Sequence, residues 1–196
     1  AVSLGVKESS VAALLGTAGV TVGLALQGGL ANLAGGVLLL LFKPFVVGDY
    51  IIQDQSNGCE GTVAKIEICY TTLLSIDNKK IVVPNGTLSN STIINVTAKE
   101  NRKLEIKVGI SYEADIQKAK RIIEKILRED ADTKSDTKEM VVFVDELADS
   151  AVIMGLRVWV STERYWPTKW RLNQKIKEEF DANGIVIPYN QMEVYV

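Results

Sequence analysis

The sequence contains no histidine and only two cysteines, Cys59 and Cys69. Histidine is the most common general base and metal ligand near neutral pH, so its absence argues against most acid–base and metal-dependent catalysis. The two cysteines have no cluster of further ligands beside them, which matches neither a zinc motif nor a disulfide framework. We therefore expect no enzyme activity, no catalytic residue, no metal and no cofactor.

Ionisable side chains are absent from Ser9 to Phe42, a run of 34 residues. From Lys43 onward, charged residues occur at the density of a water-exposed domain, and the formal net charge of the whole chain is -2. That balance gives no bulk attraction to nucleic acid, so we expect no nucleic-acid partner. One crossing of a bilayer takes about 20 apolar residues, so the uncharged run is long enough to span a membrane once.

The uncharged run is rich in glycine, with seven glycines over residues 16–36. Each glycine inside a helix costs about 1 kcal/mol relative to alanine, so we expect the run to bend. Gly28–Gly29 predicts a break between a crossing helix over 10–27 and a second helix over 30–42, which Lys43–Pro44 ends. The second helix is too short to cross again, and we expect it to lie along the membrane interface or to turn sharply.

The crossing helix has distinct faces when its residues are placed at about 100° intervals. Small residues that let membrane helices approach closely occupy two of them. If the glycine face of one copy packs against the alanine face of the next, the contact is heterologous and closes into a ring. One remaining side would then face the ring axis and form an apolar constriction. The groups are glycine at Gly16, Gly19 and Gly23, alanine at Ala18 and Ala25, the bulky outward residues Leu15, Val22 and Leu26, and the constriction pair Val20 and Leu24.

The segment from 46 to 100 has the pattern of a small all-β domain. Its short runs are separated by turn residues, at spacings that predict a five-stranded sheet or a small barrel. One run, 62–76, predicts a strand, because alternate positions carry Ile66, Ile68, Tyr70, Thr72 and Leu74. The other expected strands lie at 49–54 and 80–84, and the expected turns at 56–58, 77–78 and 84–86.

The segment from 101 to 188 predicts a ferredoxin-like α+β domain of split-βαβ order. A cluster of Tyr165, Trp166 and Trp170 occurs where its second helix begins. Packing of that helix start is the simplest explanation of the cluster, and a contact with another subunit is the alternative. The expected elements are a strand over 103–111, a helix over 116–127, strands over 140–147 and 151–160, a helix from Trp166–Pro167 to Asn183–Gly184, and a strand over 185–187.

Several segments of the chain resemble the small-conductance mechanosensitive channel family, MscS. The family's pore-lining helix resembles GLALQGGLANLAGGVLLLLFKPF, and its middle β domain resembles VGDYI, EGTVAKIEICYTTL, DNKKIVVPNG and IINVT. The end of the family's cytoplasmic domain is similar to FDANGIVIPYNQMEVYV. Because these segments follow one another in the family's order over nearly the whole chain, the combination is far more specific than any one of them.

The resemblance implies a homoheptameric mechanosensitive ion channel in the inner (plasma) membrane. Its pore sits on a hollow cytoplasmic chamber and opens under membrane tension, releasing ions and small solutes during hypo-osmotic shock. The family's constriction positions fall on Val20 and Leu24, its helix kink on Gly28 and a second flexible glycine on Gly36. The implied regions are a pore helix over 1–45, an Sm-like middle β domain over 46–100, an α/β domain over 101–188 and a strand of an oligomeric β-barrel over 189–196.

Three features depart from the family pattern. The first constriction position is commonly leucine, and the shorter Val20 predicts a slightly wider or less hydrophobic ring at this level. Gly29 beside Gly28 predicts a looser kink than a single glycine gives. The family's two earlier membrane helices have no counterpart in these residues, and we expect them to precede Ala1 in the complete protein.

Three alternatives to a channel remain open from the residues alone. An ordinary membrane anchor also uses glycine, but Gln27 counts against it because an amide is costly in lipid. A membrane-tethered ring module that binds RNA or peptide would need exposed basic and aromatic residues, of which the β segment offers only Lys65 and Tyr70. A ligand-gated or ion-coupled transport subunit usually needs an intramembrane charge, and residues 9–42 contain none.

Overall fold

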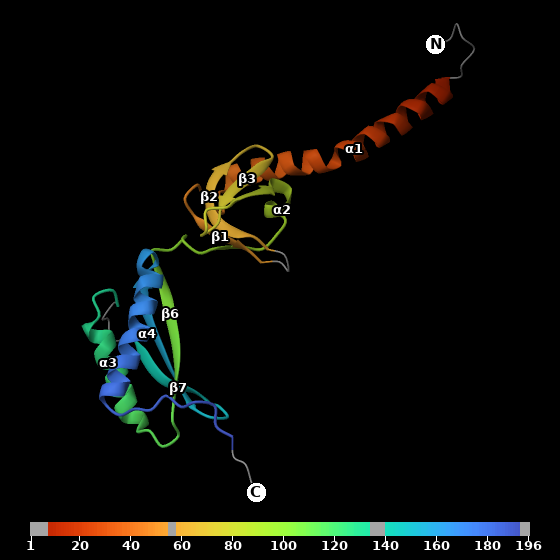
Figure 1. Cartoon of the computed structure of the whole chain (residues 1–196). Helices are drawn as coiled ribbons and strands as arrows, with labels where there is room; N and C mark the ends of the chain where they lie inside the picture. The colour runs from red at the N-terminus through yellow and green to blue at the C-terminus, as the bar shows by residue number, and fades with distance from the viewer. Residues whose placement is uncertain (1–7, 55–57, 134–139, 193–196) are drawn as a thin grey trace. The chain divides into compact units, whose positions relative to one another are not determined.

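The structure is a computed structural model that describes residues 8–54, 58–133 and 140–192, and it divides into two compact units, residues 1–98 and 99–196 (Figure 1). The first unit contains one long helix and a β domain. Its elements are α1 (Glu8–Phe42), β1 (Tyr50–Gln53), β2 (Glu60–Ile66), β3 (Tyr70–Leu74), β4 (Lys80–Pro84), α2 (Asn85–Ser89) and β5 (Ile93–Asn95). The second unit contains β6 (Asn101–Ile110), α3 (Ile116–Glu129), β7 (Val141–Leu147), β8 (Val152–Ser161), the short 3-10 helix η2 (Thr162–Arg164) and α4 (Tyr165–Ala182).

The helix α1 is continuous over 35 residues, so the predicted break into two separate helices at Gly28–Gly29 is wrong, whereas the expected bend at these glycines stays a prediction. Glycine still supplies an N–H and a C=O group to the helical hydrogen bonds. The surrounding alanines and leucines favour the helix strongly enough for it to continue through Gly28 and Gly29. The helix ends where predicted. Lys43 adopts a left-handed φ of 45° and its N–H donates to the Leu39 carbonyl at 3.0 Å, and Pro44 has no N–H with which to continue.

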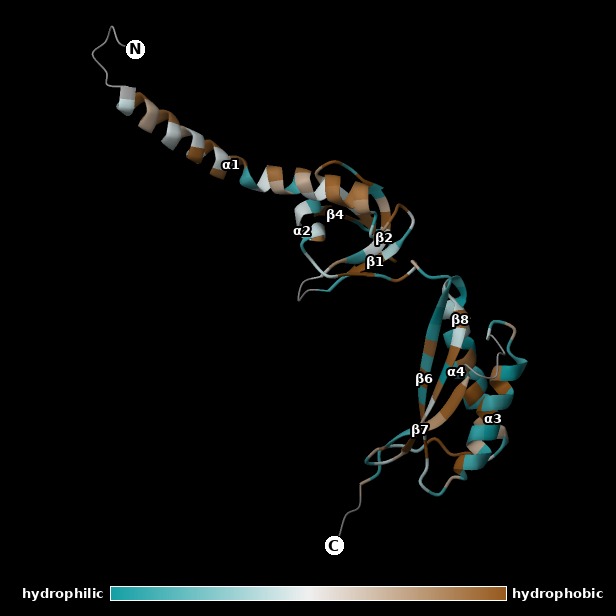
Figure 2. Cartoon of the chain, turned by 180° about the vertical axis from the view of Figure 1, so that it is seen from behind, coloured by the Kyte–Doolittle hydropathy of each residue, from teal (hydrophilic) through white to brown (hydrophobic). Residues whose placement is uncertain are grey.

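Most of the surface of α1 is left exposed by the residues that the structure describes. The stretch Ser9–Phe42 is long and apolar enough to cross a membrane, and only 17% of its most apolar window is buried. Figure 2 shows hydrophobic residues at intervals along the length of the helix, and large apolar side chains are exposed from Leu14 to Phe42. A helix that is apolar all round needs lipid or other helices around it.

The β domain is a five-stranded antiparallel sheet with the order β4-β3-β2-β1-β5. The sequence analysis predicted either a five-stranded sheet or a small barrel, and the five-stranded sheet is present. The prediction of a single strand over 62–76 is wrong, because the chain reverses between β2 and β3. The Glu67 N–H donates to the Tyr70 carbonyl at 2.8 Å across this reversal. The alternation of apolar residues stays in phase through the turn, so periodicity alone does not reveal it. The turn at 77–78 is confirmed by the left-handed Asn78, whereas most of the expected turn at 56–58 lies outside the described residues.

The second unit is a three-stranded antiparallel sheet of order β6-β8-β7, with α3 and α4 packed against it. The helix α4 ends at Asn183–Gly184 as predicted, in a Schellman motif in which the Ile185 N–H donates to the Phe180 carbonyl at 2.9 Å. The strand predicted over 185–187 does not form. The Ser111 N–H donates to the Val186 carbonyl at 2.9 Å, and a single bond of this kind is not a ladder.

The end of the chain has no regular structure from 189 to 192, and the remaining residues of the predicted terminal strand lie outside the described residues.

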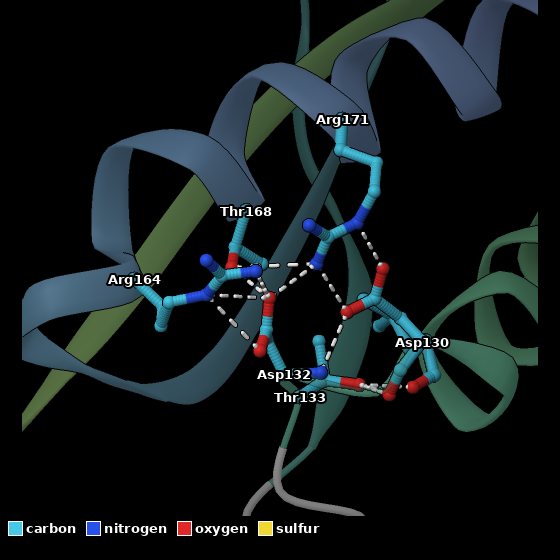
Figure 3. A network of polar contacts seen from close by, with 7 residues as sticks. Asp130, Asp132, Thr133, Arg164, Thr168 and Arg171 are labelled. Atoms are coloured by element: carbon cyan, nitrogen blue, oxygen red, sulfur yellow. Dashed lines mark hydrogen bonds and ion pairs between the residues drawn. The ribbon is translucent and has the colours of Figure 1, made fainter.

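A buried ion-pair network joins the end of α3 to α4 (Figure 3). The Asp130 carboxylate, whose side chain is 1% exposed, accepts from Arg171 Nε and Nη2 at 2.8 Å each, and Arg171 Nη2 also contacts Asp132 at 2.8 Å. Burial raises the pKa of Asp130, but the hydrogen bonds from Arg171 and from the Asp132 N–H outweigh it and leave the pKa lowered. The same bonds to Asp130 and Asp132 raise the pKa of Arg171.

We expect Arg171→Met to destabilise the second unit by about 2 to 3 kcal/mol, because it leaves the Asp130 carboxylate buried without its partner. Denaturant unfolding followed by tryptophan fluorescence measures this, since all three tryptophans lie in this unit. Lys177→Met removes an exposed ion pair with Asp181 and serves as the matched control, with an expected cost of about 0.5 kcal/mol or less.

The stabilisation by Arg171 should fade as the pH falls below the ordinary Asp pKa of 3.8, because the lowered folded-state pKa means that stability is lost on protonation. Equal losses in the two variants would show that the network does not hold the unit together.

Candidate pore helix and its attachment to the β domain

The predicted constriction and packing residues all lie on the part of α1 that extends away from the β domain. Val20 and Leu24 are 64% and 67% exposed within the chain and are one helical turn apart. A Cβ atom added at Gly16, Gly19 or Gly23 would meet no atom within 4 Å. The chain alone therefore gives no steric reason for glycine at these positions.

Two hydroxyl groups on this part of α1 are satisfied inside the helix. Thr21 Oγ1 donates to the Thr17 carbonyl at 2.8 Å, and Thr17 Oγ1 donates to the Ala13 carbonyl. Threonine that bonds back to its own helix needs no water, which is the arrangement that a helix in lipid or against another helix requires.

The last turns of α1 are anchored in the core of the β domain. Leu39 and Phe45 are almost completely buried there, on either side of the point where the helix ends. They pack in one hydrophobic cluster with residues from four strands and from α2, and these are Ile51, Val63, Leu73, Val83 and Leu88. Full burial of side chains of this size contributes about 1.5 to 3 kcal/mol each, so the helix end and the sheet form one folded body.

Gly35 and Gly36 bring the backbone of α1 directly against the β domain. A Cβ atom on Gly36 would lie 2.0 Å from the Ile68 carbonyl oxygen, and one on Gly35 would lie 2.7 Å from the carbonyl of Asn85. No side chain fits in either place, so the two positions require glycine for the close approach. The structure thus assigns Gly36 a packing role, and its predicted role as a flexible point stays a prediction.

The side chain of Asn85 connects three segments beneath these glycines. It is fully buried, its Nδ2 donates to the Glu67 carbonyl at 2.7 Å, and its Oδ1 accepts from Thr71 Oγ1 at 2.8 Å. Its backbone N–H donates to the Cys69 carbonyl at 2.9 Å. The sequence analysis identified Asn85 only as part of a turn, whereas it begins α2 and holds the β2–β3 connection in place.

A second asparagine links the helix to the same site. Asn32 Oδ1 accepts from the Gly86 N–H at 3.1 Å, across 54 residues of sequence, and a Cβ atom on Gly86 would lie 2.8 Å from that oxygen. Sequence reasoning missed this residue because a half-buried asparagine in an apolar helix has no signature other than its polarity. With Gly35, Gly36 and Asn85, it forms what we call the helix–β joint.

The segment between α1 and β1 is held by Asp49. Its Oδ2 accepts from the Val46 N–H at 2.9 Å and from Asn95 Nδ2 at 2.8 Å, and its Oδ1 accepts from Thr97 Oγ1 at 3.3 Å. Burial raises the pKa of Asp49, but these three hydrogen bonds outweigh it and the pKa is lowered. The helix–β joint, the buried helix end and this carboxylate together attach α1 and the segment after it to the β domain.

Two family profiles match the chain over most of its described length. Residues 29–98 match the profile described as "Mechanosensitive ion channel, beta-domain", and residues 104–187 match "Mechanosensitive ion channel MscS, C-terminal". The first match includes the whole helix–β joint.

Similar proteins carry the same description. The small-conductance mechanosensitive channel of Edwardsiella ictaluri is 42% identical over 91% of this chain and 61% of its own length. An uncharacterized MscS family protein of Buchnera aphidicola is 37% identical over 97% of this chain and 66% of its own length, and the channel of Helicobacter pylori is 33% identical over 99% and 70%. The solved structure of H. pylori MscS in its closed state superposes with a TM-score of 0.88 at 31% identity, covering 98% of this chain and 75% of that one. The chain thus spans about two thirds of the length of these curated relatives.

We expect Gly36→Ala to open the helix–β joint, because its Cβ atom would overlap the Ile68 carbonyl and overpacking of this kind costs about 1 to 3 kcal/mol. Hydrogen–deuterium exchange of the complete protein should show amides of α2 and of the β2–β3 connection exchanging about tenfold faster or more. Gly29→Ala is the control, since its Cβ atom would meet nothing within 4 Å and should leave these amides unchanged. Unchanged exchange in Gly36→Ala would mean that the helix is not fixed at this point.

Proposed function

This chain belongs to the MscS family of mechanosensitive channels, and we propose that it forms the pore-lining helix and the water-exposed domains of a channel subunit opened by membrane tension. The open pore would release ions and small solutes in hypo-osmotic shock. The observation that carries this proposal is the division of α1 into two parts. One part is apolar, uncharged and uncovered, and the other is locked to the β domain by the helix–β joint.

The uncovered part of α1 supports a ring of identical subunits, with seven copies expected from the family resemblance. The open space at Gly16, Gly19 and Gly23 would receive the small side chains Ala18 and Ala25 of the neighbouring helix. Close packing of backbones is the main attraction between helices in lipid, where no hydrophobic effect drives them together. Tension favours the state with the larger in-plane area, so sliding of alanine along the glycine face would widen the ring without any nucleotide or cofactor.

In such a ring Val20 and Leu24 would line the narrowest part of the pore. Both are apolar and largely exposed among the residues that the structure describes, so most of each side chain is available to a neighbouring subunit or to the pore. A narrow apolar ring excludes water and ions by dewetting, and expansion of the ring hydrates it.

The proposed kink at Gly28 and Gly29 belongs to the assembled channel. These residues lie between the uncovered part of α1 and the joint at Gly35–Gly36, and a Cβ atom at either would meet no atom within 4 Å. Bending at this point would let the pore lining tilt while the joint stays packed, and Gly36 would be the second flexible position if the joint opens.

We place the channel in the inner (plasma) membrane with both domains after α1 in the cytoplasm. Residues 1–45 would form the pore helix, 46–100 the middle β domain, 101–188 the α/β domain and 189–196 one strand of a barrel shared by all copies. Patch-clamp recording of the complete protein in pure lipid under graded suction tests the proposal. Currents that appear only under tension support it, and silence at every sub-lytic tension from an assembled ring overturns it.

We expect Leu24→Ser to give a channel that opens at lower tension, because a hydroxyl in the apolar constriction favours the hydrated state. Val20→Asp should act in the same direction and more strongly, since a carboxylate cannot remain dry. Val22→Ser on the outward face is the control and should keep the tension threshold of the unchanged protein. If the thresholds of both constriction variants also stay unchanged, these residues are not the gate.

We expect Gly19→Leu to block the close approach of neighbouring helices and to reduce assembly of the ring. Val22→Leu places the same leucine side chain on the outward face and should assemble normally. Native mass spectrometry of the purified protein compares the two. An intact and normally gating ring from Gly19→Leu would refute the glycine groove.

A further inference from the structure

The connection between the two units is residues 96–100, which join the end of β5 to the start of β6. The connection contains neither helix nor strand, and the boundary of the units lies between Ala98 and Lys99. Relative motion is the default expectation for two compact units joined in this way. The hydrogen bonds of the connection therefore decide where along the chain such motion is possible.

Thr97 ties the connection to the first unit. Its Oγ1 accepts from the Tyr50 N–H at 2.9 Å and donates to Asp49 Oδ1 at 3.3 Å, and its own N–H donates to Asn95 Oδ1 at 3.2 Å. Asp49 also accepts from the Val46 N–H, so the same carboxylate holds the segment that follows α1. We call Asp49, Asn95 and Thr97 the first strap.

Thr162 ties the connection to the second unit. As the first residue of η2, it donates from its N–H to the Glu100 carbonyl at 2.8 Å, and its Oγ1 donates to the Lys99 carbonyl. We call Thr162 and these two carbonyl groups the second strap. Each strap lies within one unit, so neither depends on how the units are placed.

Tyr165 supports the second strap from the start of α4. Its ring packs against the hydrophobic core, and the Arg102 guanidinium lies over the ring, 4.0 Å from its centroid. Packing of the helix start thus explains Tyr165, whereas Trp166 and Trp170 of the same aromatic cluster are 51% and 64% exposed. The beginning of β6 is consequently fixed to the beginning of α4 by the second strap and by this stacked pair.

Ala98 lies between the two straps and belongs to neither. Its side chain is exposed, and among the residues that the structure describes neither its N–H nor its carbonyl makes a hydrogen bond. The chain is held at Thr97 on one side and at Lys99 on the other. Hinges in proteins are a few residues that absorb a change in φ and ψ, and the backbone of Ala98 is free to do so.

We propose that Ala98 is the pivot between the two units, and that the two straps confine relative motion of the units to this residue. Rotation about the backbone bonds of one residue turns the second unit as a rigid body, because the chain on either side is bonded to its own unit. Loss of the first strap would extend the free segment back to residue 96, and loss of the second would extend it to residue 100. The proposal concerns the connection only and does not require that the protein conducts ions.

Single-molecule energy transfer in the complete protein measures the motion. Donor and acceptor dyes are attached at Lys79→Cys in the first unit and Lys125→Cys in the second, both exposed positions, in a Cys59→Ser, Cys69→Ser background. Labelled copies are assembled with a large excess of unlabelled copies, so that a particle holds at most one labelled copy. The width of the distance distribution between the dyes reports how far the units move.

We expect Thr97→Val and Thr162→Val each to widen the distance distribution about twofold, because each removes the hydroxyl of one strap and lengthens the free segment. Thr97→Ser and Thr162→Ser are the matched controls, since they keep the hydroxyl, and should retain the width of the unchanged protein. Hydrogen–deuterium exchange of β2 and β8 shows whether both units stay folded. Equal widths in the valine and serine variants would overturn the role of the straps.

Substitutions of Ala98 test the pivot itself and leave both straps in place. We expect Ala98→Gly to widen the distribution and Ala98→Pro to narrow it, because glycine enlarges and proline restricts the backbone angles of this residue. Ala182→Gly, at the exposed end of α4, is the control and should change nothing. If all Ala98 variants have the same width, Ala98 is not the pivot. Tension-gated currents are recorded separately, so the proposed channel stands or falls independently of this result.

Discussion

The close approach of the α1 backbone to the β domain at Gly35–Gly36 is the constraint on which the rest of the first unit depends. Because no Cβ atom fits against Ile68 or Asn85 at these two positions, the helix can sit only where its glycines meet those carbonyl groups. That contact places Leu39 in the core and Asn32 within hydrogen-bonding distance of Gly86. The membrane helix and the sheet are consequently one mechanical body at this end, although they differ completely in their preferred solvent.

The glycines of α1 therefore have different roles at different positions of the helix. Gly35 and Gly36 are explained within the chain, by atoms that occupy the space of their side chains. Gly16, Gly19 and Gly23 have no such neighbours. Each of these glycines lowers the stability of the helix, and a contact outside the chain would have to offset that loss. Close packing against another helix does so, whereas contact with lipid does not favour small residues in this way. In the ring that we propose, that contact comes from a further copy of the same helix.

Two errors of the sequence analysis have a common cause. The reversal between β2 and β3 and the continuity of α1 through Gly28–Gly29 both depend on what packs nearby. Apolar alternation continues in phase through Ile66, Ile68 and Tyr70, although hydrogen bonds turn the chain there. Local propensity predicted a break at the double glycine, but the helical ladder carries through it. Apolar alternation and helix propensity describe the average behaviour of residues in many proteins. At these two points the neighbouring hydrogen bonds of this chain determined the structure instead.

By itself, the sequence determined the apolar membrane-length segment, the β domain, the order of the α/β elements as far as α4 and the family, because charge density, periodicity and motif order are properties of the linear chain. The candidate constriction at Val20 and Leu24 also follows from helical geometry. Only the tertiary structure showed that Asn85 and Asn32 hold the helix to the sheet, that Gly36 is a packing position, and that Trp166 and Trp170 remain uncovered. Hydrogen bonds between residues far apart in sequence, and the space around a missing Cβ atom, exist only once the chain has folded.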